Sequence, residues 1–133
     1  SNLRGPYFLV QGLVEELRAA KGAVINIVDI HSEKPMSGHG VYCMSKAGLA
    51  MMTRALAWEL GPDIRVNGVS PGAIMWPENE PGDAEKQNIL DRTSLGRIGD
   101  PGDIASAVAY LALDAPYVTG QILAVDGGRS LNI

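Results

Sequence analysis

A tyrosine and a lysine stand four residues apart near the middle of the chain, at Tyr42 and Lys46. The residues that follow have a strongly helical pattern, and side chains at this spacing lie on one face of a helix. Because a nearby ammonium favours the phenolate, we expect Lys46 to lower the pKa of Tyr42 from its ordinary value of about 10. Tyr42 would then be a usable proton donor or acceptor near neutral pH. Amphipathic helices often contain this spacing by chance, so the pair does not by itself identify a catalytic site.

Asp29 is an acidic residue near the end of an apolar run. The run covers residues 24–30 and is rich in β-branched side chains, which is typical of a parallel strand covered by helices on both faces. A carboxylate there costs free energy unless it has a partner or lies in a solvated cleft. Two interpretations are open: Asp29 belongs to a functional site, or it caps the turn after the strand.

The elements that must position these residues alternate between helices and strands. Apolar side chains at helical spacing predict helices, and short β-branched runs bounded by turn residues predict strands. The expected elements are helix 3–20, strand 24–30, helix 40–60, strand 64–69, helix 101–113 and strand 121–125. Gly22 is expected to stop the first helix, and Asp100 and Pro101 to begin the last one. This alternation predicts an α/β fold with a parallel sheet.

The helix expected over 40–60 is apolar nearly all round, with Met51, Met52 and Trp58 among its large side chains. A helix without a wet face must be covered by its own core or by another subunit. We therefore expect a homo-oligomer.

The segment 75–93 is long, polar and contains Trp76. A loop of this length in a compact domain is usually a functional lid or disordered, and we favour a lid. Trp76 could stack on a flat heteroaromatic ring, although a packing role is an equally open interpretation.

The segment from the strand to Tyr42, Lys46 and the following Ala47-Gly48 resembles the active-site segment of the short-chain dehydrogenase/reductase family. In that family a Ser usually stands thirteen residues before the Tyr. In this chain the position is Asp29. An Asp in place of the Ser is the pattern of the pteridine reductases within the family. The resemblance continues through four further motifs, Pro71-Gly72, 97–101, 117–121 and Asp126-Gly127-Gly128, and covers essentially the whole chain.

The resemblance implies roles for several residues. Tyr42 would donate a proton, Lys46 would assist it and hold the nicotinamide ribose, and Asp29 would orient a pterin or pass protons to Tyr42. Asn2 would hold a water that relays protons to Lys46. The backbone of Pro71, Gly72, Ala73 and Ile74 would lie against the nicotinamide carboxamide, and Trp76 would contact the substrate. The implied cofactor is NADPH, and the implied assembly is a homotetramer.

The chain contains no G-x-G-x-x-G or T-G-x-x-x-G-x-G motif to hold a pyrophosphate. Gly38 and Gly40 do not fit a strand-turn-helix cradle either. We therefore expect residues 1–133 to be the C-terminal half of a doubly wound, Rossmann-type parallel sheet, with the N-terminal half absent. The residues that distinguish NADPH from NADH would lie in that other half.

The overall composition narrows the class of protein. The net charge is −4 and the 11 basic residues are scattered, so a nucleic-acid partner is not expected. The single Cys43 and the spacing of His31 and His39 fit neither an internal disulfide nor a zinc site. No apolar run approaches the roughly 20 residues that span a bilayer. We expect a cytoplasmic protein without a metal or a membrane partner.

The resemblance to the pteridine reductases implies a reductase of pterins or dihydropterins, and possibly folates. It would transfer a hydride from NADPH to a C=N carbon while Tyr42 protonates the nitrogen. Two alternatives stay open. One is a short-chain reductase of a carbonyl substrate such as a 3-oxoacyl thioester, which a Ser at position 29 would have favoured. The other is an inactive fragment or an assembly module.

Overall fold

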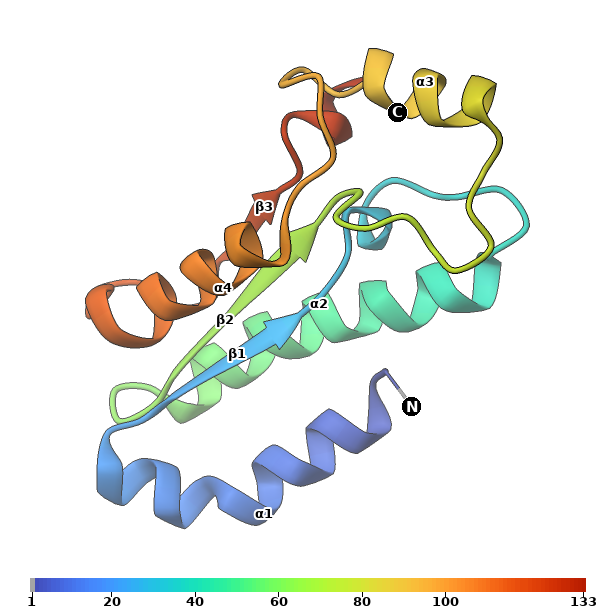
Figure 1. Cartoon of the computed structure of the whole chain (residues 1–133). Coiled ribbons are helices and arrows are strands. Elements are labelled where there is room, and N and C mark those ends of the chain that lie inside the picture. The colour runs from blue at the N-terminus through green and yellow to red at the C-terminus, as the bar shows by residue number, and fades with distance from the viewer. Residues whose placement is uncertain (1) are drawn as a thin grey trace.

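The computed structural model describes residues 2–133, in which helices and strands alternate as the sequence predicts (Figure 1). The helices are α1 (Arg4–Ala20), α2 (Gly40–Leu60), α3 (Asp83–Asp91) and α4 (Pro101–Ala109). The strands are β1 (Ala23–Ile27), β2 (Arg65–Pro71) and β3 (Ile122–Val125). The short helices are η1 (Ile30–Ser32), the π-helical η2 (Tyr110–Asp114) and η3 (Arg129–Asn132).

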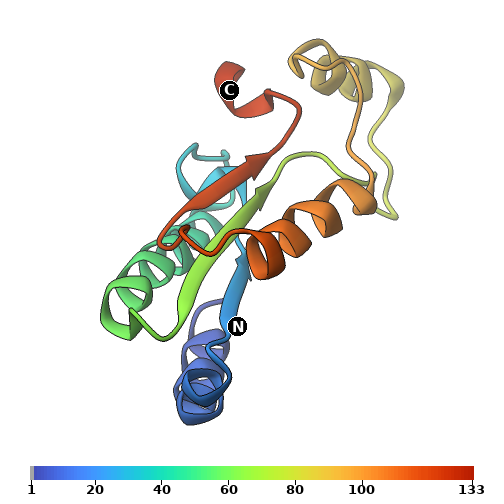
Figure 2. The same cartoon turned by 90° about the vertical axis from the view of Figure 1, so that its left-hand side faces the viewer.

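The three strands form one parallel sheet in the order β1-β2-β3. In its register Ile25 lies beside Asn67, and Val69 lies beside Leu123. Helices α1 and α2 cover one face of the sheet and α4 covers the other, as the two views together show (Figures 1 and 2). This three-layer arrangement confirms the predicted α/β fold class.

The core has two parts, one on each face of the central strand β2. On one face Val66 packs with residues of α1 and α2, including Val10, Leu49 and Leu56. On the other face Val69 packs with Leu111 and Ala115, which follow α4. Burial on both faces explains why this strand carries an apolar run instead of an alternating pattern.

Two boundaries differ from the predictions for local reasons. Strand β1 ends at Ile27 and not at Ile30, because Asp29 accepts a hydrogen bond from the backbone N–H of His31 and begins the turn of η1. Helix α1 ends through Lys21, which takes a left-handed conformation with φ of 48°, and not through Gly22.

The segment 75–93 is not the uninterrupted loop that the sequence predicts, because α3 forms inside it. Asp83 and Glu85 lie in the first turn of α3, where negative charge is favourable beside the unpaired backbone N–H groups. No residue of α3 is buried. The absence of an apolar stripe explains why the pattern did not reveal the helix, and the role of the segment as a lid stays a prediction.

Strand β1 forms an edge of the sheet, and apolar side chains are exposed beside it. Ile27 at the end of β1 is 45% exposed, and Leu9 and Leu13 of α1 are also exposed. Strands of parallel sheets are normally covered on both faces, and exposed apolar edges favour association. This surface is consistent with the prediction that further strands belong to the sheet. None of the helices formed by residues 2–133 is long and apolar enough to cross a membrane.

We predict that Thr53→Val destabilises the fold. The Thr53 hydroxyl is fully buried and accepts a hydrogen bond of 2.9 Å from the Asn26 amide, which joins α2 to β1. Valine keeps the shape of the side chain but leaves the amide without this partner, at a cost of about 1–3 kcal/mol. Urea denaturation measures the loss, and Val41→Ala at an exposed site is the control. Equal stability of Thr53→Val and the unaltered chain would contradict the prediction.

Candidate active site

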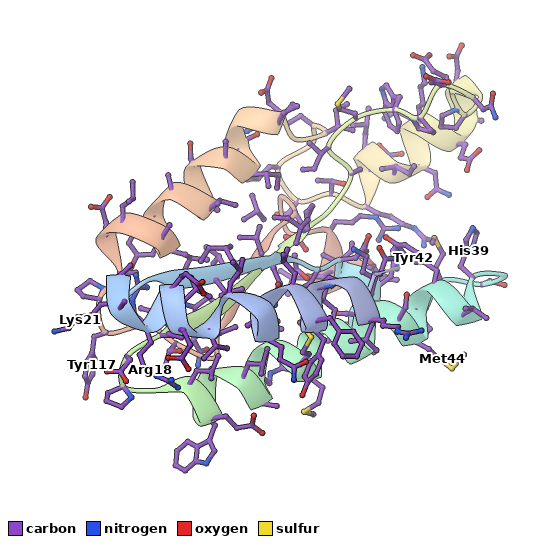
Figure 3. All side chains as sticks on the ribbon, turned by 90° about the horizontal axis from the view of Figure 1, so that it is seen from below. Arg18, Lys21, His39, Tyr42, Met44 and Tyr117 are labelled. Carbon is purple, nitrogen blue, oxygen red and sulfur yellow. The ribbon has the colours of Figure 1, made fainter. Side chains whose placement is uncertain are left out.

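The candidate site lies at the carboxyl ends of the parallel strands. Asp29 follows β1, and Gly72 follows the neighbouring strand β2. Tyr42 lies in the first turn of α2 and points toward this end of the sheet, whereas Met44 points away from it (Figure 3). In open α/β sheets ligands bind at the carboxyl ends of the strands, so the fold brings these groups to a suitable place.

A hydrogen bond joins the two residues singled out from the sequence. The Tyr42 hydroxyl donates to Asp29 Oδ2 at 2.7 Å. The other carboxylate oxygen, Oδ1, accepts from the backbone N–H of His31 at 2.8 Å. Asp29 therefore caps the turn after the strand, and it also contacts Tyr42. Its membership of a functional site stays a prediction.

Lys46 lies on the same side of α2 as Tyr42, as the four-residue spacing predicts. Its Nζ is 5.9 Å from the centroid of the Tyr42 ring and donates a hydrogen bond of 3.1 Å to the carbonyl of Ile27. The ammonium is thus held at the carboxyl end of β1. It contacts the face of the phenol ring and is not hydrogen-bonded to the hydroxyl oxygen.

The expected direction of the Tyr42 pKa is wrong for this arrangement. Burial, followed by the hydrogen bond to Asp29 and the negative charge of that carboxylate, raises the pKa of Tyr42 to about 12. The spacing of Tyr42 and Lys46 correctly placed a cation nearby. The pKa expectation considered only this cation and left out burial of the phenol and the hydrogen bond that Asp29 accepts from it.

The backbone after β2 is fixed from two sides. Gly72 N–H donates to the carbonyl of Val125 at 3.2 Å, and the carbonyl of Ala73 accepts from Gly99 N–H at 2.8 Å. A Cβ on Gly72 would come within 2.7 Å of Asp126 Cβ, so only glycine fits this approach. Sequence reasoning assigned no such role to Gly99 or Asp126, although both lie in motifs that it noted.

The remaining predicted site residues do not meet at Tyr42. Trp76 belongs to the segment that contains α3, which lies on the α4 side of the sheet, well apart from η1 and the start of α2 (Figure 2). Asn2 is exposed just before α1. The next residue, Leu3, packs against Gly48, two residues beyond Lys46, so this end of α1 lies beside α2. The roles of Trp76 and Asn2 stay predictions.

Comparison with known proteins identifies the family. Residues 1–130 match the family model described as enoyl-(acyl carrier protein) reductase. The chain belongs to the short-chain dehydrogenase/reductase family. Proteins of this family use nicotinamide cofactors. The catalytic roles that the resemblance implies for Tyr42 and Lys46 stay predictions.

Individual short-chain dehydrogenase/reductase relatives differ in their substrates. The chain is 39% identical over 138 residues to the L-xylulose reductase of Caenorhabditis elegans, covering 98% of this chain and 55% of the relative. It is 36% identical over 135 residues to the dihydromonapterin reductase of Enterobacter sp. (strain 638), covering 98% of this chain and 55% of the relative. The apo SCOR enzyme from Clostridium thermocellum matches with a TM-score of 0.87 and 32% identity, over 99% of this chain and 51% of that chain. The chain thus spans about half the length of these relatives.

We predict that Asp29→Asn lowers the pKa of Tyr42 from about 12 toward its ordinary value of about 10. The substitution removes the negative charge while keeping a hydrogen-bonding side chain. An absorbance titration of the phenols near 295 nm measures the change, and Tyr42→Phe identifies the component that belongs to Tyr42. A component near pH 12 that stays unchanged in Asp29→Asn would contradict the prediction.

The same pKa shift sets a direction for stability. Because the folded state raises the pKa of Tyr42, its contribution to the free energy of unfolding is fully present below about pH 10 and is lost as the pH rises through about 12. The loss in this window should therefore be smaller in Tyr42→Phe.

Proposed function

We propose that this chain is the catalytic half of an NADPH-dependent reductase of pterins or dihydropterins. The observation that carries the proposal is the 2.7 Å hydrogen bond between Tyr42 and Asp29, which puts a carboxylate beside the phenol. A pterin ring offers several N–H groups, and a carboxylate accepts hydrogen bonds from them more strongly than a hydroxyl does. The similarity to a dihydromonapterin reductase supports the same substrate class.

The residues present fit the nicotinamide end of the cofactor. Lys46 Nζ lies at the end of β1, and the close approach of Gly72 to Asp126 leaves the backbone of residues 71–74 at the end of the adjacent strand. The ammonium would hold the nicotinamide ribose, and that backbone would hold the carboxamide. When bound, NADPH supplies the hydride that is transferred to the C=N carbon. Contacts to the adenosine and phosphates are expected from the other half of the parent protein.

Tyr42 would donate its hydroxyl proton to the substrate nitrogen as the carbon accepts the hydride. In the present arrangement that proton is directed at Asp29, so the hydroxyl must turn toward the substrate before transfer. The phenolate left behind would be stabilised by Lys46, whose ammonium needs only to leave the Ile27 carbonyl. Asp29, when protonated, would return a proton to Tyr42, and Asn2 would support a water on the path to Lys46.

A carbonyl reductase is the second candidate, with a 3-oxoacyl thioester as one such substrate. It needs the same proton from Tyr42 and the same cation, and the similarity to an L-xylulose reductase favours it. Asp29 is the feature that argues against it, because a carbonyl oxygen has no N–H group to donate to a carboxylate. A non-enzymatic fragment or assembly module is the third alternative, which activity of the parent protein would eliminate.

We predict that Tyr42→Phe in the full-length parent lowers turnover by about two to four orders of magnitude, because it removes the general acid. Affinity for NADPH should change little, since the ribose contact expected of Lys46 stays. Steady-state kinetics and cofactor titration separate the two effects. Turnover within a few-fold of the unaltered protein would exclude Tyr42 from the mechanism.

We predict opposite effects of Asp29→Ser on the two substrate classes. In the parent protein, reduction of a dihydropterin should fall by about tenfold or more, because a charge-assisted hydrogen bond is lost. Reduction of a generic carbonyl substrate, which needs only Tyr and Ser, should be kept or improved. Rates on both substrates are compared for the unaltered protein, Asp29→Ser and Asp29→Asn. Full pterin reduction in both variants would leave Asp29 as a turn cap and favour the carbonyl alternative.

We also propose a homo-oligomer, a tetramer by resemblance, in which a second copy covers the outer side of α1 and α2. A groove of about 570 Å³ lies between these helices and is lined by Tyr7, Phe8 and Met51 among others. Met51 is 61% exposed and Trp58 is 89% exposed, so the chain's own core does not cover this surface. The apolar side chains of α2 are thus divided between two faces: Met52 lies in the core, whereas Met51 and Trp58 are exposed, and a partner would cover these two.

We predict that Met51→Glu weakens association of the chain. A charge in an apolar interface lacks compensation, whereas the same change at Met75, which is also exposed but follows β2, should have little effect. Light scattering at micromolar concentration gives the mass of each variant. A well-folded monomer for the unaltered chain would contradict the oligomer proposal.

A further inference from the structure

The Lys86 side chain of α3 makes two contacts with residues that precede the helix. Its Nζ lies 5.4 Å from the centroid of the Trp76 ring and forms an ion pair with Glu80 Oε2. The Lys86 side chain is only 23% exposed, although no residue of α3 is buried in the core. The two contacts connect α3 back to the segment that leads into it.

Trp76 and Glu80 precede α3 and lie outside any regular element. A cation over an indole face is attracted by the negative charge of the ring face, and the carboxylate holds that cation in place. One ammonium therefore connects Trp76, Glu80 and Lys86.

We propose that Lys86 is a positioning residue for Trp76: it fixes the indole against α3, so that the ring is presented in one orientation to a flat heteroaromatic substrate. The inference rests on the proposed pterin reduction and names a residue that determines how its substrate is held. Lys86 acts through Trp76 and takes no part in proton transfer. Because the contacts lie at the surface, loss of either one should not unfold the chain.

The first test asks whether Lys86 controls Trp76. The chain has two Trp residues, so Trp58→Phe leaves Trp76 as the only one. In this background Lys86→Met should raise acrylamide quenching of Trp76 fluorescence by about twofold, and Lys86→Arg, which keeps a cation over the ring, should restore it. Lys21→Met removes a charge far from α3 and is the matched control. Equal acrylamide quenching in Trp58→Phe with and without Lys86→Met would overturn the inference, whatever the substrate.

The second test asks whether this positioning matters for binding. A 7,8-dihydropterin is titrated into the same variants, and quenching of Trp76 reports binding. Lys86→Met should weaken the affinity by about two- to fivefold, which corresponds to the loss of an exposed cation–π contact, and Lys86→Arg should keep it. If Trp76 becomes exposed while the affinity is unchanged, the positioning role is wrong and the pterin proposal stands. If the unaltered chain binds no dihydropterin at millimolar concentration, the inference fails, and so does a pterin role for Trp76. The proposed substrate class is still decided separately, by the activity of Asp29→Ser in the full-length protein.

Discussion

The contact between Tyr42 and Asp29 depends on how α2 lies against the sheet. Tyr42 is in the first turn of a helix that continues to Leu60, so its position is set by packing farther along that helix. Leu49 and Leu56 bury against the sheet, and the Thr53 hydroxyl pairs with Asn26 of β1. An apolar face alone would allow the helix to slide, but a buried hydrogen bond between specific atoms fixes its register. The 2.7 Å contact at one end is therefore a consequence of packing in the middle.

A cation and an anion compete for the same phenol at this site. Asp29 accepts a hydrogen bond from the Tyr42 hydroxyl and stabilises the neutral phenol, whereas Lys46 would stabilise the phenolate if its ammonium reached the oxygen. In the present arrangement burial of the phenol, followed by the hydrogen bond and charge of Asp29, raises the pKa of Tyr42 to about 12. A proton donor in this state is poorly acidic until Asp29 is protonated or engaged by a substrate N–H group. A substrate that occupies Asp29 would thus also release Tyr42, which links recognition to proton transfer.

The sequence predicts what local patterns control and fails where long-range packing decides. The bounds of α2 and the common face of Tyr42 and Lys46 follow from helical spacing, and three parallel strands follow from short β-branched runs. The direction of the Tyr42 pKa was wrong, because burial of the phenol and its contact with the carboxylate arise only when β1 and α2 pack together. Helix α3 was missed because it buries no residue and so has no apolar periodicity. The backbone hydrogen bond from Gly99 N–H to the Ala73 carbonyl joins two segments that are distant in the sequence, so no local pattern predicts it.

The parts of the candidate site differ in how firmly they pack against the core. Asp29, Tyr42 and Gly72 sit at the ends of elements that contribute buried residues to the core, and the backbone near Gly72 is held from two sides. Trp76 instead belongs to a segment whose helix buries nothing and which stands apart from η1 and the start of α2 (Figure 2). Regions with few buried contacts open at low free-energy cost, whereas packed elements move only with the whole domain. In the proposed function the proton chemistry would thus be built on the packed part, and contact of Trp76 with a substrate ring would require the other part to approach. Such a division would allow the segment around Trp76 to change with the substrate while the geometry of Tyr42, Asp29 and Lys46 stays the same.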